Sequence, residues 1–139
     1  MWKKSYSMVT DKVTAEQMWA LFSDVNNWHT WDQGIEYARL EGEFEKGSSF
    51  LLRPKGGPEV TVKLVVTEKN SRFVDVTAFP LAKMYFEHVF EPTGQKLRIT
   101  NTLSMTGLLG FLWVKLVAGK IAESMPEEMM HEIEAARKL

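Results

Sequence analysis

The sequence predicts an α+β fold, in which a curved antiparallel sheet of about seven strands wraps around one long C-terminal helix. Two observations predict it. Residues 107–139 contain the one long stretch with helical spacing of apolar residues, and residues 34–106 contain short runs separated by turn residues at hairpin spacing. A sheet with one apolar face and a helix with one apolar stripe must bury these surfaces against each other. We therefore expect the sheet to curl around the helix and to leave a cavity between them.

The composition is ordinary for a globular protein. The 139 residues are 45% hydrophobic and 25% charged, with a formal net charge of −1, which predicts one domain over residues 1–139. No basic stripe stands out, so a nucleic-acid partner is not expected. The absence of cysteine excludes disulfides and thiolate chemistry and fits a reducing compartment. The longest apolar run, 108–117, is too short to span a bilayer, and no signal peptide is visible. We expect a cytoplasmic protein without an integral membrane segment.

The N-terminal part predicts one strand followed by two short helices. Residues 3–10 alternate well enough for a strand. Thr14 and Gln17 then form a capping-box pattern at the start of a short helix, whose buried face holds Met18, Trp19 and Phe22. Asp24 can cap a second short helix that ends near Trp28.

Six further strands complete the predicted sheet. They are separated by turn signals, of which the clearest are the Pro- and Gly-containing stretches 54–58 and 92–95. The strands are expected at residues 35–40, 48–53, 60–68, 72–79, 83–91 and 96–106. Their hairpin spacing predicts an antiparallel meander.

The C-terminal helix carries one apolar and one polar stripe. The apolar stripe consists of Phe111, Val114, Ala118, Ile121, Met125, Met129, Ile133 and Ala136, and the polar one of Lys120, Glu123, Glu127, His131, Glu134 and Lys138. Pro126 interrupts the backbone hydrogen bonding, and Ser124–Glu127 has the pattern of a capping box. The helix therefore either kinks or breaks and restarts there. The unbroken phase of the apolar stripe favours one kinked helix.

Several stretches, in this order, resemble the START/birch-pollen-allergen-like superfamily, in its polyketide cyclase/dehydrase and lipid transport branch. They are Phe22–Asp32, Leu40–Phe44 with Gly47, Phe86–Pro92 and Thr106–Gly110. The resemblance covers essentially the whole chain and implies a helix-grip fold, a curved sheet around a long C-terminal helix with a hydrophobic cavity between. It also implies binding or transport of an apolar small molecule, or, in a minority of members, cyclisation or dehydration. Pro126 departs from the family pattern.

One histidine is predicted to point into the apolar side of the sheet. Strand alternation places His88 on the face of Phe86 and Phe90, and Asn101 on the inner face of the next strand. If Phe90 pairs with Leu97, His88 and Asn101 are diagonal neighbours. They can satisfy each other or a trapped water, anchor a ligand oxygen, or, for His88, act as a general acid or base. The direction of Asp75 depends on a one-residue register that the sequence leaves open.

Burial is expected to lower the pKa of His88 and to keep it neutral at pH 7, unless Asp75 also points inward. Replacing His88 by Ala is expected to leave the fold intact and to favour lipophiles without a polar head. The three histidines, at 29, 88 and 131, show no metal-ligand spacing, and His131 is expected to face solvent. We expect no metal and no cofactor.

Two groups of apolar residues have both a structural and a functional interpretation. Trp28, Trp31 and Asp32 either seal the core and cap local backbone groups or line a cavity mouth. Methionines fill ordinary cores and also line walls that adapt to a ligand, and five lie on segments expected to face inward or nearly so: Met84, Met105, Met125, Met129 and Met130.

The leading hypothesis is a carrier or sensor that binds a lipid-like or polyketide-like molecule between sheet and helix. Its expected ligand-binding residues are Trp31, Met84, Phe86, His88, Asn101, Met105, Phe111, Val114, Met125 and Met129. The first alternative is a cyclase or dehydratase that uses His88 with Asp75 or Asn101. The second is an interaction module, because the helix start is apolar on several faces and must meet protein, membrane or the other copy of a homodimer: Leu108, Leu109, Leu112, Trp113, Leu116 and Val117.

Overall fold

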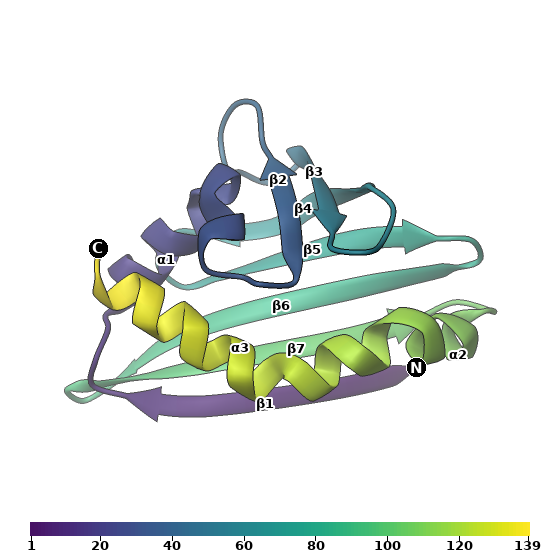
Figure 1. Ribbon diagram of the computed structural model, residues 1–139. Helices are drawn as coiled ribbons and strands as arrows, with labels where there is room; N and C mark the ends of the chain where they lie inside the picture. Colours follow the sequence, from purple (N-terminus) through teal and green to yellow (C-terminus); the bar gives the residue numbers. More distant parts are fainter.

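The structure is a computed structural model that describes residues 1–139, and all the predicted elements are present (Figure 1). In chain order they are β1 (Trp2–Thr10), α1 (Ala15–Ser23), the 3₁₀-helix η1 (Val25–Thr30), β2 (Ile35–Arg39), β3 (Ser49–Pro54), β4 (Val60–Glu68), β5 (Arg72–Phe79), β6 (Ala82–Thr93), β7 (Lys96–Thr106), α2 (Gly110–Trp113), the π-helix η2 (Val114–Ala118) and α3 (Gly119–Arg137).

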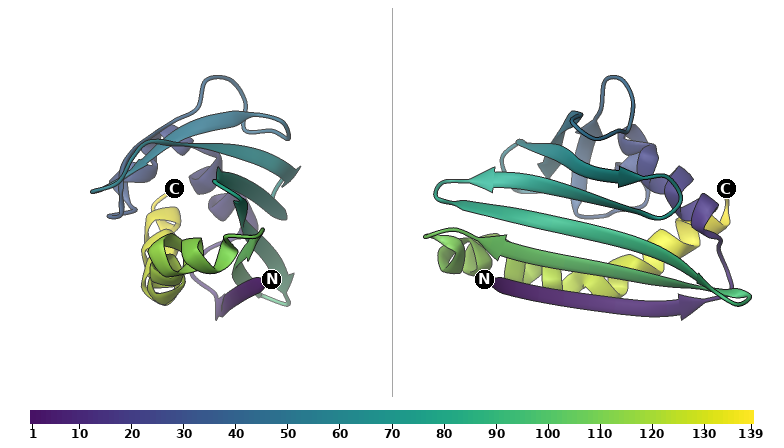
Figure 2. Two further views of the ribbon diagram at one scale, coloured as in Figure 1. Left: turned by 90° about the vertical axis from the view of Figure 1, so that its right-hand side faces the viewer. Right: turned by 180° about the vertical axis from the view of Figure 1, so that it is seen from behind.

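The seven strands form one antiparallel sheet in the order β1-β7-β6-β5-β4-β3-β2. Strands β2 to β7 follow one another as a meander, and β1 pairs along its whole length with β7, from Trp2 opposite Met105 to Thr10 opposite Leu97. The sheet is strongly curved, and the C-terminal helical segment lies on its concave side (Figures 1 and 2). The predicted helix-grip architecture is confirmed.

The capping box at the start of α1 forms as predicted. The Thr14 hydroxyl accepts from the backbone N–H of Gln17 at 3.2 Å, and the Gln17 side chain accepts from the backbone N–H of Thr14 at 2.9 Å. The second short helix is the 3₁₀-helix η1, and the Asp24 side chain makes no cap to its backbone. Asp24 accepts instead from the side-chain amide of Asn27 at 2.8 Å. These two helices cover the inner face of the sheet beside the C-terminal end of α3 (Figure 1).

The C-terminal helical segment runs without a break from Gly110 to Arg137, and Pro126 lies inside α3. The predicted capping box at Ser124 does not form. The Ser124 hydroxyl donates to the carbonyl of Ile121 at 2.9 Å instead, as serines inside helices do. Neither this segment nor any other helix has the length and hydropathy that crossing a membrane requires.

A π-turn over Val114–Ala118, which sequence spacing did not predict, changes which residues of the helix face inward. A π-turn adds about one residue to a helical turn, so an inward stripe changes phase across it. Ala118, Met125 and Met129 are buried as predicted, whereas Phe111, which precedes the turn, is 74% exposed. The placement of Phe111 in the cavity is therefore wrong. Met130 is also exposed, because it lies one position beyond the inward-facing Met129.

The interior consists of two apolar clusters. The larger one joins α1, η1 and the middle of the sheet to the end of α3, and includes Phe22, Phe73 and Met129. The smaller one lies between the ends of β6 and β7 and the first half of the C-terminal helical segment, and it comprises Ala82, Met84, Leu103, Met105, Ala118 and Met125. The polar side chains described next lie where the strands of these two clusters meet.

Gly107, directly after β7, provides a test of how the helix start is held against the sheet. Its φ is +108°, and an added Cβ would overlap the carbonyl oxygen of Leu81 and lie 2.7 Å from the Cα of Ala82. Gly94, in the β6–β7 turn, also has a positive φ, +66°, but nothing lies within 4 Å of an added Cβ. We expect Gly107→Ala to lower the free energy of unfolding by at least about 2 kcal/mol more than Gly94→Ala, measured by chemical denaturation. Equal losses would show that the close approach at Gly107 is easily relieved.

Candidate functional site

A chain of three buried polar side chains connects the sheet to the helix. His88 on β6, Asn101 on β7 and Glu132 on α3 are 6%, 1% and 4% exposed. The Nδ1 atom of His88 lies 2.8 Å from Oδ1 of Asn101, and Nδ2 of Asn101 donates to Oε1 of Glu132 at 3.3 Å. Polar groups are costly in an apolar interior unless they are paired, and these three pair with one another.

The β6–β7 register places the first two members directly opposite each other. Strand β6 continues past its predicted end and shortens the turn, so Phe90 pairs with Ile99 rather than with Leu97. His88 then faces Asn101 directly, and not diagonally as predicted. A directly opposed pair brings the two side chains within hydrogen-bonding distance without distortion of the strands.

The His88 ring is enclosed by aromatic rings. Its centroid lies 4.5 Å from those of Phe73 and Phe86, both nearly parallel to it, and 4.7 Å from that of Phe22. Burial lowers the pKa of His88 to about 4, and the hydrogen bond to Asn101 opposes this only in part. His88 points inward as predicted, and burial lowers its pKa although Asp75, described below, also points inward. Because three rings contact it, His88→Ala would remove packing as well as a hydrogen bond, and the expectation that this variant leaves the fold intact stays a prediction.

One nitrogen of the His88 ring is free. Since Asn101 donates through Nδ2 to Glu132, its Oδ1 accepts from Nδ1–H of His88, and Nε2 of His88 carries the lone pair. Nε2 has no hydrogen-bond partner, yet the only fully enclosed side-chain atoms without a partner are Oε2 of Glu128 and Nδ1 of His131. Nε2 of His88 is therefore an unpaired acceptor within the apolar wall.

Asp75 also points inward, which settles the register that the sequence left open. On β5 the buried residues are Phe73, Asp75 and Thr77, and Asp75 lies opposite Phe86 on β6. This places Asp75 diagonally across from His88, which lies opposite Phe73. Burial, with no compensating hydrogen bond, raises the pKa of the Asp75 carboxyl to about 7.

Sequence reasoning missed Glu132. Burial is the main reason that its pKa is raised to about 8; the hydrogen bond from Asn101 lowers it, and the nearby Glu128 carboxyl raises it further. A signal was present, because Glu132 follows Met125 by seven residues and Met129 by three, which is the spacing of the inward stripe. A glutamate at such a position must be neutral, paired or both.

A second polar cluster lies beside Glu132, where α3 passes the segment after η1. Oδ1 of Asp32 accepts from the backbone N–H of Gly34 at 2.9 Å, which is the local role predicted for it, and burial raises its pKa. Burial and the Asp32 charge raise the pKa of Glu128, whose Oε1 lies 3.6 Å from Nδ1 of His131. His131 is thus half-buried, and the prediction that it faces solvent is wrong.

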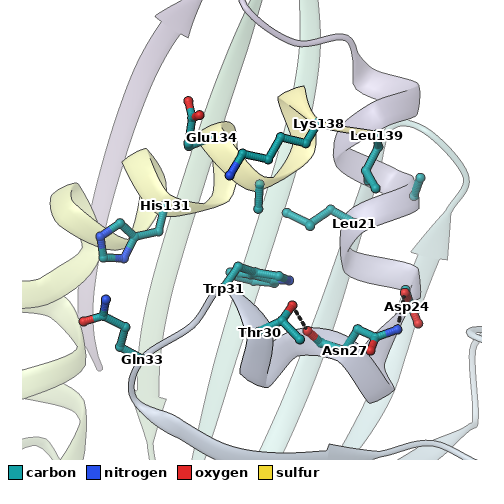
Figure 3. A pocket seen from close by; sticks show the side chains of 12 residues that line it. Leu21, Asp24, Asn27, Thr30, Trp31, Gln33, His131, Glu134, Lys138 and Leu139 are labelled. Carbon is teal, nitrogen blue, oxygen red and sulfur yellow. Dashed lines mark hydrogen bonds between the residues drawn. The ribbon is translucent and has the colours of Figure 1, made fainter.

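Two hollows of the molecule lie outside this chain of polar groups. A pocket of about 480 Å³ lies between α1, η1 and the end of α3, and Leu21, Asn27, Trp31, His131 and Lys138 are among its lining residues (Figure 3). Another, of about 740 Å³, lies over α1 and the segment before β3, beside Trp19 and Phe44. Neither is lined by His88, Asn101 or Glu132.

The expected ligand-binding residues are divided among these regions. Four methionines are buried in the two apolar clusters: Met84, Met105 and Met125 in the smaller one, and Met129 in the larger one. Val114 and Phe86 pack against the smaller cluster and remain half-buried, so the inner face of the sheet is incompletely covered there. Trp31 is half-buried and lines the 480 Å³ pocket, while Trp28 is buried and donates to the carbonyl of Phe22 at 2.9 Å.

No group of three or more His, Cys, Asp or Glu side chains is arranged to hold a metal ion. The chemistry that the site itself offers is hydrogen bonding and proton transfer. It combines a neutral imidazole with two buried carboxyls, Asp75 and Glu132, whose pKa values lie near neutrality.

We expect Glu132→Gln to alter the pH dependence of stability. The pKa of the Glu132 carboxyl rises from 4.5 to about 8 on folding. The contribution of this group to the free energy of unfolding is therefore complete below pH 4.5 and is lost as the pH rises through about 8. The variant should therefore gain stability relative to wild type between about pH 5 and about pH 9, by at most about 1.4 kcal/mol per pH unit, in chemical denaturation. His88, whose lowered pKa has the opposite effect at acid pH, cancels in this comparison.

The exposed Glu127 on the same helix provides the control. The free energy of unfolding of Glu127→Gln should differ from that of the wild type by the same amount at about pH 5 and at about pH 9. If Glu132→Gln were instead less stable than the wild type by the same amount at these two pH values, Glu132 would be a permanently charged, stabilising member of the polar chain.

Comparisons with known proteins agree with this architecture. Residues 1–136 match the family described as polyketide cyclase / dehydrase and lipid transport. A hypothetical protein, jhp0584, from Helicobacter pylori superposes with a TM-score of 0.80 at 12% identity, over 97% of this chain and 88% of that one. A START superfamily protein from Mycobacterium smegmatis superposes with a TM-score of 0.71 at 15% sequence identity, over 95% of this chain and 97% of that one. Norcoclaurine synthase from Thalictrum flavum superposes with a TM-score of 0.71 at 14% identity, over 99% of this chain and 84% of that one.

No curated protein matches the chain in sequence. At 12–15% identity the three structures show a shared fold, which confirms the predicted START-like resemblance. The family match spans all the strands and helices except the last residue of α3. The chain therefore belongs to the polyketide cyclase/dehydrase and lipid transport family.

Proposed function

We propose that the protein binds an apolar small molecule, lipid-like or polyketide-like, between the sheet and α3, and acts as its carrier or sensor. The observation that supports this most directly is the His88–Asn101–Glu132 chain within an apolar wall, with Nε2 of His88 left free. The family description, which includes lipid transport, supports the same class of ligand. The cysteine-free chain fits action in the cytoplasm.

The free nitrogen specifies the polar group of the ligand. A neutral imidazole Nε2 accepts a hydrogen bond and cannot donate one when Nδ1 carries the proton. The bound molecule should therefore present an O–H group, such as an alcohol, a phenol or a protonated acid. A carboxylate would be disfavoured, because the buried carboxyl of Asp75 is diagonal to the same ring.

The apolar part of the ligand would contact flexible walls. Met84, Met105 and Met125 come from two strands and α3, and unbranched methionine side chains adapt to ligands of different outline. Phe86 and Val114 leave part of the inner face uncovered beside them. We place the apolar part of the ligand there, with its hydroxyl directed at His88.

The test uses a matched pair of probes, 2-naphthol and 2-methylnaphthalene, and the variant His88→Phe. Phenylalanine preserves the ring stacking on Phe73 and Phe86, whereas His88→Ala would also open a void. We expect His88→Phe to weaken naphthol binding about fivefold, the equivalent of one hydrogen bond, and to leave methylnaphthalene binding unchanged in titration calorimetry. His29→Phe, at an exposed histidine, is the control. If neither probe binds the wild type, the carrier proposal is abandoned; if both weaken equally, His88 only packs.

A second candidate function is a cyclase or dehydratase, and the inward carboxyl of Asp75 is the observation that favours it. A pKa of about 7 lets this carboxyl both accept and donate a proton near neutrality, while His88, with a pKa of about 4, would serve as an acceptor. Norcoclaurine synthase, which shares the fold, is named as an enzyme.

We expect Asp75→Asn to reduce the rate of any such reaction by about 100-fold or more. Dehydration of an aromatic β-hydroxy ketone, followed by the absorbance of the conjugated enone, is a suitable assay. Asp11→Asn, at an exposed carboxylate, should retain the rate. Wild-type protein that gives no more enone than buffer would remove the enzymatic alternative.

A further inference from the structure

Large apolar side chains are exposed together where β7 leads into the C-terminal helical segment. We call them the α2 patch, and they are Leu81, Leu108, Phe111, Leu112 and Leu116. Leu108 is 83% and Phe111 74% exposed. Exposed leucines occur singly on most proteins, but a cluster of five large apolar side chains marks a contact surface.

The patch is presented by a well-fixed support. The backbone N–H of Leu109 donates to the carbonyl of Leu81 at 3.0 Å, and Nε1 of Trp113 donates to the carbonyl of Pro80 at 2.9 Å. The Trp113 ring also stacks on Phe79 at a centroid distance of 4.7 Å. These contacts hold the β5–β6 turn against α2, and both lie at the same end of the molecule as the N-terminus (Figure 1).

The π-turn explains why the helix exposes this face. It allows Ala118 to be buried and Trp113 and Val114 to pack on the small apolar cluster, while Phe111, Leu112, Lys115 and Leu116 face outward. Phe111 and Lys115, and likewise Leu112 and Leu116, are four residues apart and thus lie on neighbouring turns of one face. The exposed face is therefore apolar with a cation inside it.

Lysines are enriched in the segments that form the patch and its support. Segments 1–5, 79–86 and 102–122 contain five lysines and no Asp or Glu: Lys3, Lys4, Lys83, Lys115 and Lys120. All five are exposed. The whole chain has 17 Lys and Arg against 18 Asp and Glu, which leaves 12 basic and 18 acidic side chains for the rest of the molecule. The segments that form the patch and its support are thus basic, while the rest of the chain has an acidic balance.

We propose that the α2 patch docks the protein on the surface of an anionic lipid membrane. Leucine and phenylalanine side chains would enter the boundary between headgroups and acyl chains, and the lysines would contact the negatively charged headgroups with their apolar stems lying along the lipid. Each Lys near such a surface contributes attraction that a neutral surface lacks.

A second copy of the chain fits this surface less well. A symmetric dimer through the patch would place Lys115 of one copy and its equivalent in the other within the same apolar contact, and like charges there oppose association. The segments that contain the patch residues, 79–86 and 102–122, have no acidic side chain that could pair with them. An anionic bilayer supplies both the apolar depth and the opposite charge.

Membrane docking through the α2 patch does not require a bound ligand. The patch adjoins the small cluster of Met84, Met105 and Met125 through Trp113 and Val114. Docking would accordingly bring the incompletely covered inner face of the sheet close to the bilayer, whether or not a ligand occupies it.

The experiment is co-sedimentation of the full chain with phosphatidylcholine vesicles, with and without about one-third phosphatidylglycerol. We expect binding to the anionic vesicles, at least tenfold weaker binding to the neutral ones, and loss on raising the salt concentration. Leu108→Ser with Phe111→Ser, and separately Lys115→Glu with Lys120→Glu, should each weaken anionic-vesicle binding at least tenfold. Because all four side chains are exposed, thermal unfolding of the variants should match that of the wild type.

Met130→Ser and Lys69→Glu, exposed residues outside the patch, are the matched controls and should bind like the wild type. Wild-type protein that fails to sediment with anionic vesicles would overturn the proposal. So would a wild-type dimer in light scattering that Phe111→Ser converts to a monomer, because the patch would then be a protein interface. Failure of the naphthol test would leave this result untouched.

Discussion

The pairing of β6 with β7 is the constraint on which the rest of the structure depends. Its register sets His88 opposite Asn101 and Met84 opposite Met105, so both the polar chain and the small methionine cluster are consequences of one alignment. A one-residue slip of β7 against β6 would turn Asn101 and Met105 to the outer face. β7 also pairs with β1, and the chain that leaves it passes directly into α2, so the same strand positions the helix.

The strands were predictable because their signals are local. Alternation, prolines and glycines fixed all seven to within a few residues, and the capping box fixed the start of α1. The helix was predicted as one segment, but the π-turn depends on how Trp113 and Ala118 pack on the sheet, and spacing alone cannot show it. Because regular α-helical spacing was assumed throughout, Phe111 was predicted to face inward. Glu132 was missed because a glutamate is expected to face solvent, although its spacing places it on the inward stripe.

Burial of the Asp75 and Glu132 carboxyls costs desolvation free energy. Asp75 and Glu132 would each stabilise the fold more as apolar residues, since desolvation opposes their ionisation. The aromatic rings around His88 have the complementary effect and keep it uncharged. Burial thus disfavours the charged form at each of these three side chains.

The π-turn divides the C-terminal helical segment into two parts whose apolar side chains point in different directions. Behind it, from Ala118 to Ala136, the helix buries its apolar residues against the protein; ahead of it, the apolar side chains of Phe111 and Leu112 point away. A single extra residue thus rotates one half of the helix relative to the other, and neither half has to change its own sequence for the other to be reoriented. Insertions and deletions in relatives at this one turn would switch a protein between an inward-facing and an outward-facing helix start, while leaving the grip of the sheet intact.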